Sequence, residues 1–274
     1  MTEQATNPNR ALWEKGDFTR IAETMRASGE ALVGEIGITS GLKVLDLGCG
    51  DGTTAVPAAR LGAEVLGVDI ASNLVAAGRR RAREAGLTNL SFQEGDASDL
   101  RDLADDQFDL VVSVFGAMFA PRPFDVAGEM VRVTRPGGRI VMANWIPADP
   151  TLVAQILRIS AGYSPPPPEG FVSPVTWGVE QDVLERFAAA GIAPERISFA
   201  RGTWTFVHPG GPGELLAIFR DFYGPTINAY AAAKAAGRAD ALQAELAQLF
   251  DGQNMATDGS TSILATYLRV SVDA

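Results

Sequence analysis

The sequence has few of the residues on which several common classes of protein depend. Among its 274 residues there is one cysteine, Cys49, and one histidine, His208. A single cysteine excludes an internal disulfide and a cysteine-rich zinc site, and we predict no metal. The longest nearly unbroken apolar run, residues 110–120, falls well short of the roughly 20 residues that span a bilayer. We therefore predict no membrane span.

Basic residues are outnumbered by acidic ones. The chain has 23 Lys and Arg against 33 Asp and Glu, which gives a net charge of −10 and a pI near 4.7. Phosphate contacts need a basic surface, so we predict no nucleic-acid partner. Residues 1–10 are polar and lack the apolar core of a secretory signal, which leads us to expect a cytoplasmic protein.

Residues 43–52 are the stretch around which the chain is organised. An apolar run that contains Asp46 leads into three glycines at alternate positions, Gly48, Gly50 and Gly52. This pattern predicts a buried strand that enters a tight turn and then a helix. Glycines let the backbone approach a ligand closely, so the turn is predicted to hold a small molecule.

Strand and helix patterns alternate along most of the chain, which predicts an α/β fold with a parallel sheet. A first helix is expected over residues 23–36. Strands are expected over residues 43–47, 63–69, 89–94, 108–114, 139–145, within 195–207 and over 262–270, and helices over 53–61, 72–85, 123–134, 151–161 and in a segment that ends at Gly191. Residues 136–138 are expected to form a turn, residues 165–168 an exposed proline run, and residues 79–83 an arginine-rich surface in solvent.

The second half has two further helical stripes. Apolar residues at helical spacing end at Gly224, and after a broken stretch a second stripe follows Asp240, the expected cap. We predict a single domain, 1–274, with an N-terminal helical cap (1–40), a ligand-binding core (41–146) and two insertions that cover a pocket (147–178 and 209–258).

Three acids stand at the carboxyl ends of successive predicted strands: Asp46, Asp69 and Asp96. Asp69 lies 19 positions (69 − 50) beyond Gly50, close to the roughly 20 expected for an acid that binds ribose hydroxyls, so the ligand is predicted to be a nucleoside. Residues 50–55 also fit the dinucleotide pattern G-x-G-x-x-A, which leaves an NAD(P)-dependent oxidoreductase as an alternative. A carboxylate before the turn would repel a pyrophosphate, and this favours a nucleoside without phosphates.

These motifs together resemble the class I S-adenosylmethionine-dependent methyltransferases, and are most similar to the branch of ubiquinone/menaquinone-type small-molecule enzymes. The matching positions are residues 44–52, Val68-Asp69, Gly95-Asp96-Ala97, Phe108-Asp109 and residues 135–138, within about residues 40 to 145. The resemblance implies a Rossmann-like, mostly parallel seven-stranded sheet with helices on both faces and an antiparallel last strand. It also implies S-adenosylmethionine as cofactor, S-adenosylhomocysteine as product, and a small-molecule methyl acceptor.

The resemblance also implies roles for individual residues. The glycine loop would lie along the methionine part with Asp46 near its amino group, Asp69 would bind the ribose, and residues 113–115 would face the sulfonium. The segment from Trp13 to Phe18 would cover the cofactor. The full set of implied cofactor-binding residues is Trp13, Phe18, Asp46, Gly48, Cys49, Gly50, Asp51, Thr53, Asp69, Ile70, Asn73, Asp96, Ala97, Ser113, Val114 and Phe115.

The sequence shows no convincing catalytic triad, and an activated sulfonium needs none. His208 is a candidate general base, although a structural or surface histidine is the favoured interpretation. The candidate acceptor pocket comprises Phe115, Met118, Phe119, Trp145, Trp177 and Tyr223, and each of these is as readily explained as core. Together they indicate a small apolar, or aromatic, acceptor. The alternatives are a nicotinamide oxidoreductase and a non-catalytic nucleoside-binding protein, and either a monomer or a homodimer is expected.

Overall fold

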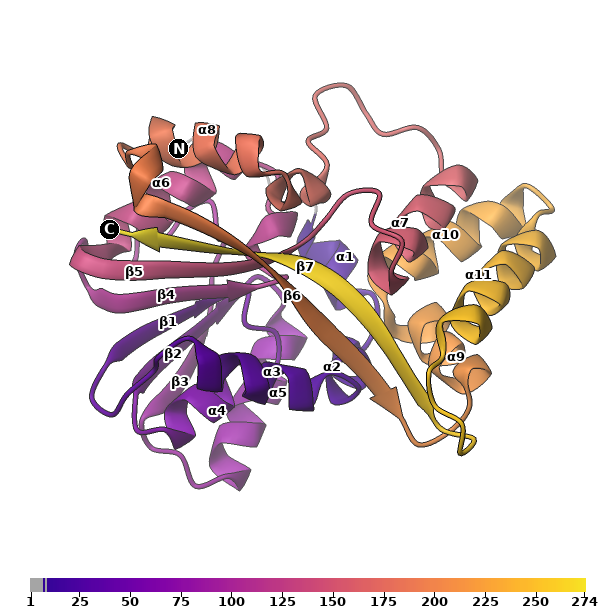
Figure 1. The fold of residues 1–274 in the computed structure, drawn as a ribbon, viewed down its shortest axis with the longest axis horizontal. Coiled ribbons are helices and arrows are strands. Elements are labelled where there is room, and N and C mark those ends of the chain that lie inside the picture. Colours follow the sequence, from indigo (N-terminus) through magenta and orange to yellow (C-terminus); the bar gives the residue numbers. More distant parts are fainter. Residues whose placement is uncertain (1–6, 8) are drawn as a thin grey trace.

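The computed structural model describes residue 7 and residues 9–274 (Figure 1). They contain a seven-stranded sheet in the order β3-β2-β1-β4-β5-β7-β6. The strands are β1 (Lys43–Leu47), β2 (Glu64–Asp69), β3 (Leu90–Glu94), β4 (Phe108–Val114), β5 (Thr134–Trp145), β6 (Ile197–His208) and β7 (Thr261–Asp273). Strands β1 to β5 pair in parallel, whereas β7 runs antiparallel to both β5 and β6, which confirms the predicted architecture.

The two central strands owe their position to their composition. Strand β1 buries four of its five residues, and β4, which pairs with it, is apolar along almost its whole length. A strand with helices on both faces has no side in water, and a nearly continuous apolar run is the sequence that suits it. Asp46 of β1 is the exception, and it lies where the strand ends.

Helices cover both faces of the sheet. Helices α4 (Ala55–Arg60) and α5 (Ser72–Glu84) pack on β2 and β3, while α6 (Pro123–Val133) packs on β5 and on α8 (Glu180–Ala189). Right-handed crossovers put α4 and α5 on one face and α6 and α8 on the other, because the strand order reverses between β1 and β4. Ligands of such sheets bind at that reversal, outside the carboxyl ends of the strands.

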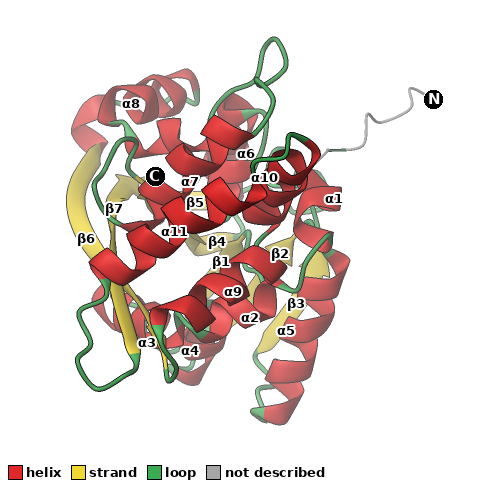
Figure 2. Cartoon of the chain, turned by 90° about the vertical axis from the view of Figure 1, so that its right-hand side faces the viewer, coloured by secondary structure: helices red, strands yellow, loops and turns green. Residues whose placement is uncertain are grey.

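A separate group of helices lies beyond those carboxyl ends (Figures 1 and 2). It consists of α7 (Leu152–Tyr163), α9 (Pro212–Phe222), α10 (Gly224–Ala235) and α11 (Ala239–Gln253), which pack on one another. Phe219 of α9 connects this group to the sheet, because its ring lies 5.6 Å from that of Phe206 in β6. Within the group, the same ring lies 5.5 Å from that of Phe250 in α11.

The N-terminal helices connect this group to the sheet domain. Helix α1 (Asn9–Glu14) contacts α10 and α5, and α2 (Phe18–Glu23) contacts α9 and α5. Helix α3 (Arg26–Glu35) then packs on α4 and β6. The described residues also form three short 3₁₀ helices: η1 (Ala117–Phe119), η2 (Pro174–Gly178) and η3 (Pro194–Arg196). Residues 1–6 and 8 of the predicted cap lie outside the described residues.

Three local predictions are wrong. Residues 136–138 belong to β5 rather than to a turn, and the strand takes them up with a register shift opposite Phe108 and Leu110. The predicted broken stretch after Gly224 is helix α10, because its proline falls in the first turn, where the missing N–H costs little. Asp240 lies inside the first turn of α11, whose N-cap is Arg238.

No helix in the described part of the chain is long and apolar enough to cross a membrane.

Candidate active site

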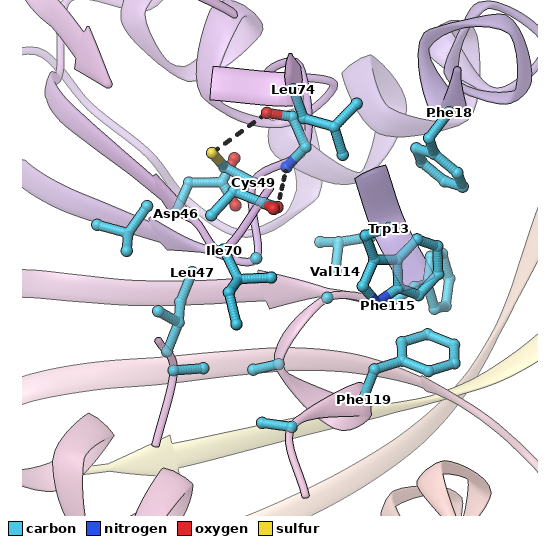
Figure 3. Close-up of a pocket in the computed structure, with 18 of the residues that line it drawn as sticks. Trp13, Phe18, Asp46, Leu47, Cys49, Ile70, Leu74, Val114, Phe115 and Phe119 are labelled. Atoms are coloured by element: carbon cyan, nitrogen blue, oxygen red, sulfur yellow. Dashed lines mark hydrogen bonds between the residues drawn. The ribbon is translucent and has the colours of Figure 1, made fainter. Parts of the chain in front are cut away.

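The principal pocket lies where the strand order reverses. Its walls come from the loops that follow β1, β2, β3 and β4, from the segment that holds α1 and α2, and from β6. Its empty volume is about 920 Å³, counting the solvent at its mouth. In Figure 3, Asp46, Cys49 and Ile70 lie on one side of the pocket, and the aromatic rings of Trp13 and Phe119 lie on the other.

The glycine loop forms one wall because its backbone can turn sharply and approach a neighbouring loop. Gly48 has φ +70°, and a Cβ built on it would stand 2.5 Å from the Cα atom of Gly116, the residue that follows the β4 loop's Phe115. Ser113 fastens the same two loops, since its hydroxyl donates to the Leu47 carbonyl at 2.7 Å and accepts from the Ala117 amide at 2.9 Å. The two central loops therefore act as one rigid floor.

Asp46 is a buried acid that lacks a hydrogen-bond partner at one oxygen. Its side chain lines the pocket, the residue is 2% exposed, and no described group bonds to its Oδ2 atom. Burial, with a smaller contribution from the negative charge of Asp69, raises the pKa of Asp46 to about 7. An unpaired carboxyl group in this position fits a cationic group such as the ammonium of an amino acid.

Asp69 is already partly satisfied by the backbone. Its Oδ2 accepts the Gly50 amide at 2.8 Å and its Oδ1 accepts the Ala71 amide at 2.9 Å. Burial raises the pKa of this carboxyl group, while those backbone bonds act in the opposite direction. Each carboxylate oxygen has two lone pairs, so both can still accept a hydroxyl proton from a ligand.

Asp96 is held by neighbours on both sides. Its Oδ1 accepts from the amide and the hydroxyl of Ser98 at 2.9 and 2.7 Å, and its Oδ2 accepts from the Asn7 side-chain amide at 2.9 Å. Asn9 donates to the Phe119 carbonyl. The residues just before and within α1 are thus attached to the β3 and β4 loops across the pocket.

Asp51 is engaged by two arginines rather than free for a ligand. It is 2% exposed and takes a double contact from the Arg26 guanidinium, one bond of which measures 2.8 Å. Arg81 donates to the Asp51 carbonyl at 2.6 Å and approaches its carboxylate at 3.5 Å. Arg81 was expected to face solvent, and that expectation is wrong, because the arginine lies over the glycine loop instead.

The opposite end of the pocket is aromatic. The Trp13 ring lies 4.9 Å from that of Phe119, 5.5 Å from that of Phe18 and 6.0 Å from that of Tyr223. Phe115, which lies beside Trp13 in Figure 3, has φ +56°, a conformation that is rare for a residue with a bulky side chain. Such strain is held in place by surrounding structure and is found mainly at functional sites.

Most of the predicted cofactor residues meet in this pocket. Of that set, all line it except Asn73, whose amide donates to the Gly16 carbonyl at 3.4 Å, and Ser113, which is buried between loops. Twelve wall residues lay outside the prediction: Asn7, Asn9, Met25, Leu47, Thr54, Val68, Leu74, Gly95, Gly116, Ala117, Ala120 and Trp204. Most are chain neighbours of predicted ones, but Met25 and Trp204 are remote in sequence and carry no local signal.

The predicted acceptor residues are more scattered. Phe115 and Phe119 line the pocket, whereas Met118, Trp145, Trp177 and Tyr223 are buried outside its wall. Trp145 lies behind Phe115, Tyr223 lies against Trp13, and Trp177 packs on Phe187.

His208 and the two insertions lie away from the pocket wall. His208 is the last residue of β6, and its Nε2 atom lies 3.9 Å from the Glu214 carboxylate. It is not among the described residues that line the pocket. No residue of 147–178 or 209–258 lines the pocket either. No group of described residues could hold a metal ion.

Comparison with known proteins agrees with this geometry. A family model described as a methyltransferase domain matches residues 38–159. The uncharacterised protein Rv1403c of Mycobacterium tuberculosis is 38% identical over 226 residues, which cover 81% of this chain and 79% of the relative. A demethylmenaquinone methyltransferase of Renibacterium salmoninarum is 35% identical over 114 residues, which cover 42% of this chain and 46% of the relative.

A solved structure shares the fold. The crystal structure of a putative methyltransferase of Bacillus halodurans has a TM-score of 0.58 and 16% identity, and the match covers 89% of this chain and 97% of that one.

The chain belongs to the S-adenosylmethionine-dependent methyltransferases, and its cofactor is S-adenosylmethionine. It is an enzyme of the class EC 2.1.1.-. This assignment decides against the nicotinamide oxidoreductase, which the glycine pattern alone permits, and against the non-catalytic nucleoside-binding protein.

Proposed function

We propose that this methyltransferase acts on a small, apolar organic acceptor. The observation that carries the proposal is the division of one pocket into an acidic end and an aromatic end. The acidic end suits an amino-acid nucleoside, and the aromatic end, next to the strained Phe115, is where an apolar acceptor would lie. Among the described wall residues there is no Lys, Arg or His to pair with an anionic acceptor.

The proposed cofactor contacts follow from the acids at the strand ends. Asp46 would pair with the ammonium group, which supplies the partner that its Oδ2 atom lacks. Asp69 would accept the ribose hydroxyls while its backbone bonds hold the glycine loop in place. Ile70, Asp96 and Ala97 would surround the adenine, at the ends of β2 and β3.

Bound S-adenosylmethionine would supply an electrophilic methyl group to a nucleophilic atom of the acceptor. The protein's part is to align the acceptor and exclude water. In the present geometry Phe115, Phe119 and Trp13 would provide the flat apolar surfaces for that alignment.

The N-terminal segment is proposed to shield the reaction from water. Glu14 accepts hydrogen bonds from the amide and hydroxyl of Ser72 at 3.1 and 2.8 Å, and Arg10 pairs with Glu94 at 3.0 Å. These contacts join α1 to the first turn of α5 and to the end of β3, and they hold Trp13 over the pocket.

A narrower assignment, to the branch that contains the ubiquinone- and menaquinone-type enzymes, is also proposed. It is supported by the partial match to a demethylmenaquinone methyltransferase and by the aromatic end of the pocket. The absence of a nucleic-acid partner, the cytoplasmic location and the choice between monomer and homodimer stay predictions.

Two measurements test the proposal in sequence. Calorimetric titration should show binding of S-adenosylhomocysteine and none of NADH; the reverse result would overturn the assignment of cofactor. A metabolite extract incubated with enzyme and methyl-labelled cofactor should then yield a labelled product of low polarity in mass spectrometry. Label found only in charged, polar products would contradict an apolar acceptor.

A further inference from the structure

Trp204 of β6 is one of the wall residues to which the sequence and the family resemblance assign no role. It lines the pocket, yet it is 1% exposed and lies about 90 positions beyond the last loop that carries a predicted cofactor contact. Its ring meets Phe115 edge to face, with centroids 4.9 Å apart and planes at 89°. Trp204 therefore stands at the aromatic end, next to the strained residue.

The polar atom of Trp204 has no hydrogen-bond partner. Its Nε1 is buried, and no described group accepts its proton. An indole nitrogen is a donor only, and a buried donor left unpaired costs about 1–3 kcal/mol. A ligand in the pocket that brings an oxygen acceptor would remove that cost.

Resting on the proposed function, we infer that Trp204 is an acceptor-binding residue, and that the methyl acceptor is an uncharged apolar ring with an oxygen that accepts the Trp204 indole N–H. An indole N–H that bonds to the acceptor in this way would disfavour a protonated amine at that point, since an amine cation has no lone pair to accept it. An anion is disfavoured as well, because the described wall contains carboxylates but no basic side chain.

Trp177 provides a matched control within the same chain. Its Nε1 is also buried and unpartnered, and the residue is equally 1% exposed. Trp177 does not line the pocket, and its ring instead packs under the Arg186 guanidinium at 4.5 Å. Loss of the indole N–H from Trp177 removes the same chemical group without touching the acceptor site.

The test measures binding of three naphthalene probes to protein loaded with S-adenosylhomocysteine, so that no turnover occurs. 2-Naphthol carries the oxygen, 2-methylnaphthalene is its apolar counterpart, and 2-naphthoate is the anion. In Trp204→Phe the affinity ratio of 2-naphthol to 2-methylnaphthalene should fall about three- to tenfold, the range for one net hydrogen bond. Trp177→Phe should leave the ratio unchanged, and 2-naphthoate should bind weakest to all three proteins.

A measurement on the unmutated protein covers the case in which Trp204→Phe is misfolded. The chain has four tryptophans, so the indole ¹⁵N–¹H spectrum can be assigned from single Trp→Phe variants. The Trp204 signal should shift downfield with 2-naphthol but not with 2-methylnaphthalene, and the Trp177 signal should stay in place.

The inference is overturned if the affinity ratio of 2-naphthol to 2-methylnaphthalene is the same in Trp204→Phe and Trp177→Phe. It is also overturned if the Trp204 signal does not shift with 2-naphthol, or if neither neutral probe binds. Tight binding of 2-naphthoate overturns it as well. Failure of the proposed function is recognised separately, since in that case the metabolite extract would yield label only in charged, polar products.

Discussion

Gly48 and Gly116 pack backbone against backbone at the point where the strand order reverses. A Cβ on Gly116 would lie 2.3 Å from the Gly48 carbonyl oxygen, and a Cβ on Gly48 would lie 2.5 Å from the Gly116 Cα atom. Both distances are shorter than any real contact, so the glycine of the β1 loop depends on a glycine in the β4 loop. The floor of the cofactor pocket is this pair, rather than the β1 loop alone.

Gly116→Ala should therefore damage both stability and cofactor binding. Since the backbone of Gly48 cannot yield without moving the loop, we expect a loss of about 1–3 kcal/mol in the free energy of unfolding and weaker binding of S-adenosylhomocysteine. Gly128→Ala is the control, because that glycine is in the middle of α6 with open space around its Cα. It should be stabilising by about 0.5–1 kcal/mol. Equal stability of the two variants in denaturant unfolding would contradict the steric argument.

Cofactor binding should depend on pH through Asp46. The pKa of its carboxyl group is about 7, and an ammonium ligand binds only the ionised form. Below pH 7 each unit should therefore reduce the affinity for S-adenosylhomocysteine by up to roughly tenfold, with a plateau above it. Calorimetric measurement of this affinity at about pH 5.5, 6.5, 7.5 and 8.5 checks the prediction. Asp46→Asn should bind S-adenosylhomocysteine weakly, with an affinity that does not change with pH. If the affinity of the wild type were equally independent of pH, Asp46 would not be the group that binds the ammonium.

The same acid should make the unliganded protein less stable as the pH rises. Because burial raises the pKa of Asp46 from 3.8 to about 7, the folded state holds a proton that the unfolded state has already lost. Its contribution to stability is fully present below the unfolded pKa and is lost as the pH rises through about 7. The melting temperature of Asp46→Asn minus that of the wild type should therefore increase as the pH is raised from about 5 to about 8. A constant difference across that range would be inconsistent with the shifted pKa.

The sequence was sufficient for features with a local cause. The bounds of β1 and β4 were predicted correctly, because a strand buried on both faces needs a continuous apolar run. The acids and glycines at strand ends were predicted to meet because the carboxyl ends of parallel strands lie at one edge of the sheet. Of these, Asp46, Asp69 and Asp96 all line one pocket.

What the sequence could not provide depends on contacts between distant segments. Trp204 reaches the pocket only because β6 joins the far edge of the sheet through β7, which is the last strand in the chain. Which of the expected acceptor residues line the pocket and which are buried in the core depends on ring–ring packing. Trp145, for example, stacks behind Phe115 and is thereby kept out of the pocket wall. Spacing along the chain carries no information on either arrangement.

The ion pair of Arg26 and Asp51 should contribute measurably to stability, unlike an exposed pair. Asp51 is 2% exposed, so Arg26→Ala leaves a buried carboxylate with Arg81 as its remaining partner. We expect a loss of about 2 kcal/mol in the free energy of unfolding. In Glu23→Ala the lost pair with Arg20 is exposed at both ends, its charged atoms are 3.8 Å apart, and the cost should be within about 0.5 kcal/mol. Equal costs in urea unfolding would show that Asp51 is not a buried partner.

Asp69 has two tasks that a single substitution would confuse. It holds the glycine loop through the Gly50 amide and is proposed to bind the ribose hydroxyls. Asp69→Ala should weaken binding of S-adenosylhomocysteine by about 1.5–3 kcal/mol, the scale of charge-assisted hydrogen bonds. The 2′,3′-dideoxy analogue, which has no ribose hydroxyls to offer, separates the two tasks. Wild-type protein should bind the natural ligand more tightly than this analogue. Asp69→Ala should lose most of that preference, because without the carboxylate neither ligand can form the hydrogen bonds between Asp69 and the ribose hydroxyls. If instead the variant weakens both ligands equally, Asp69 acts on the loop alone and another group must hold the ribose.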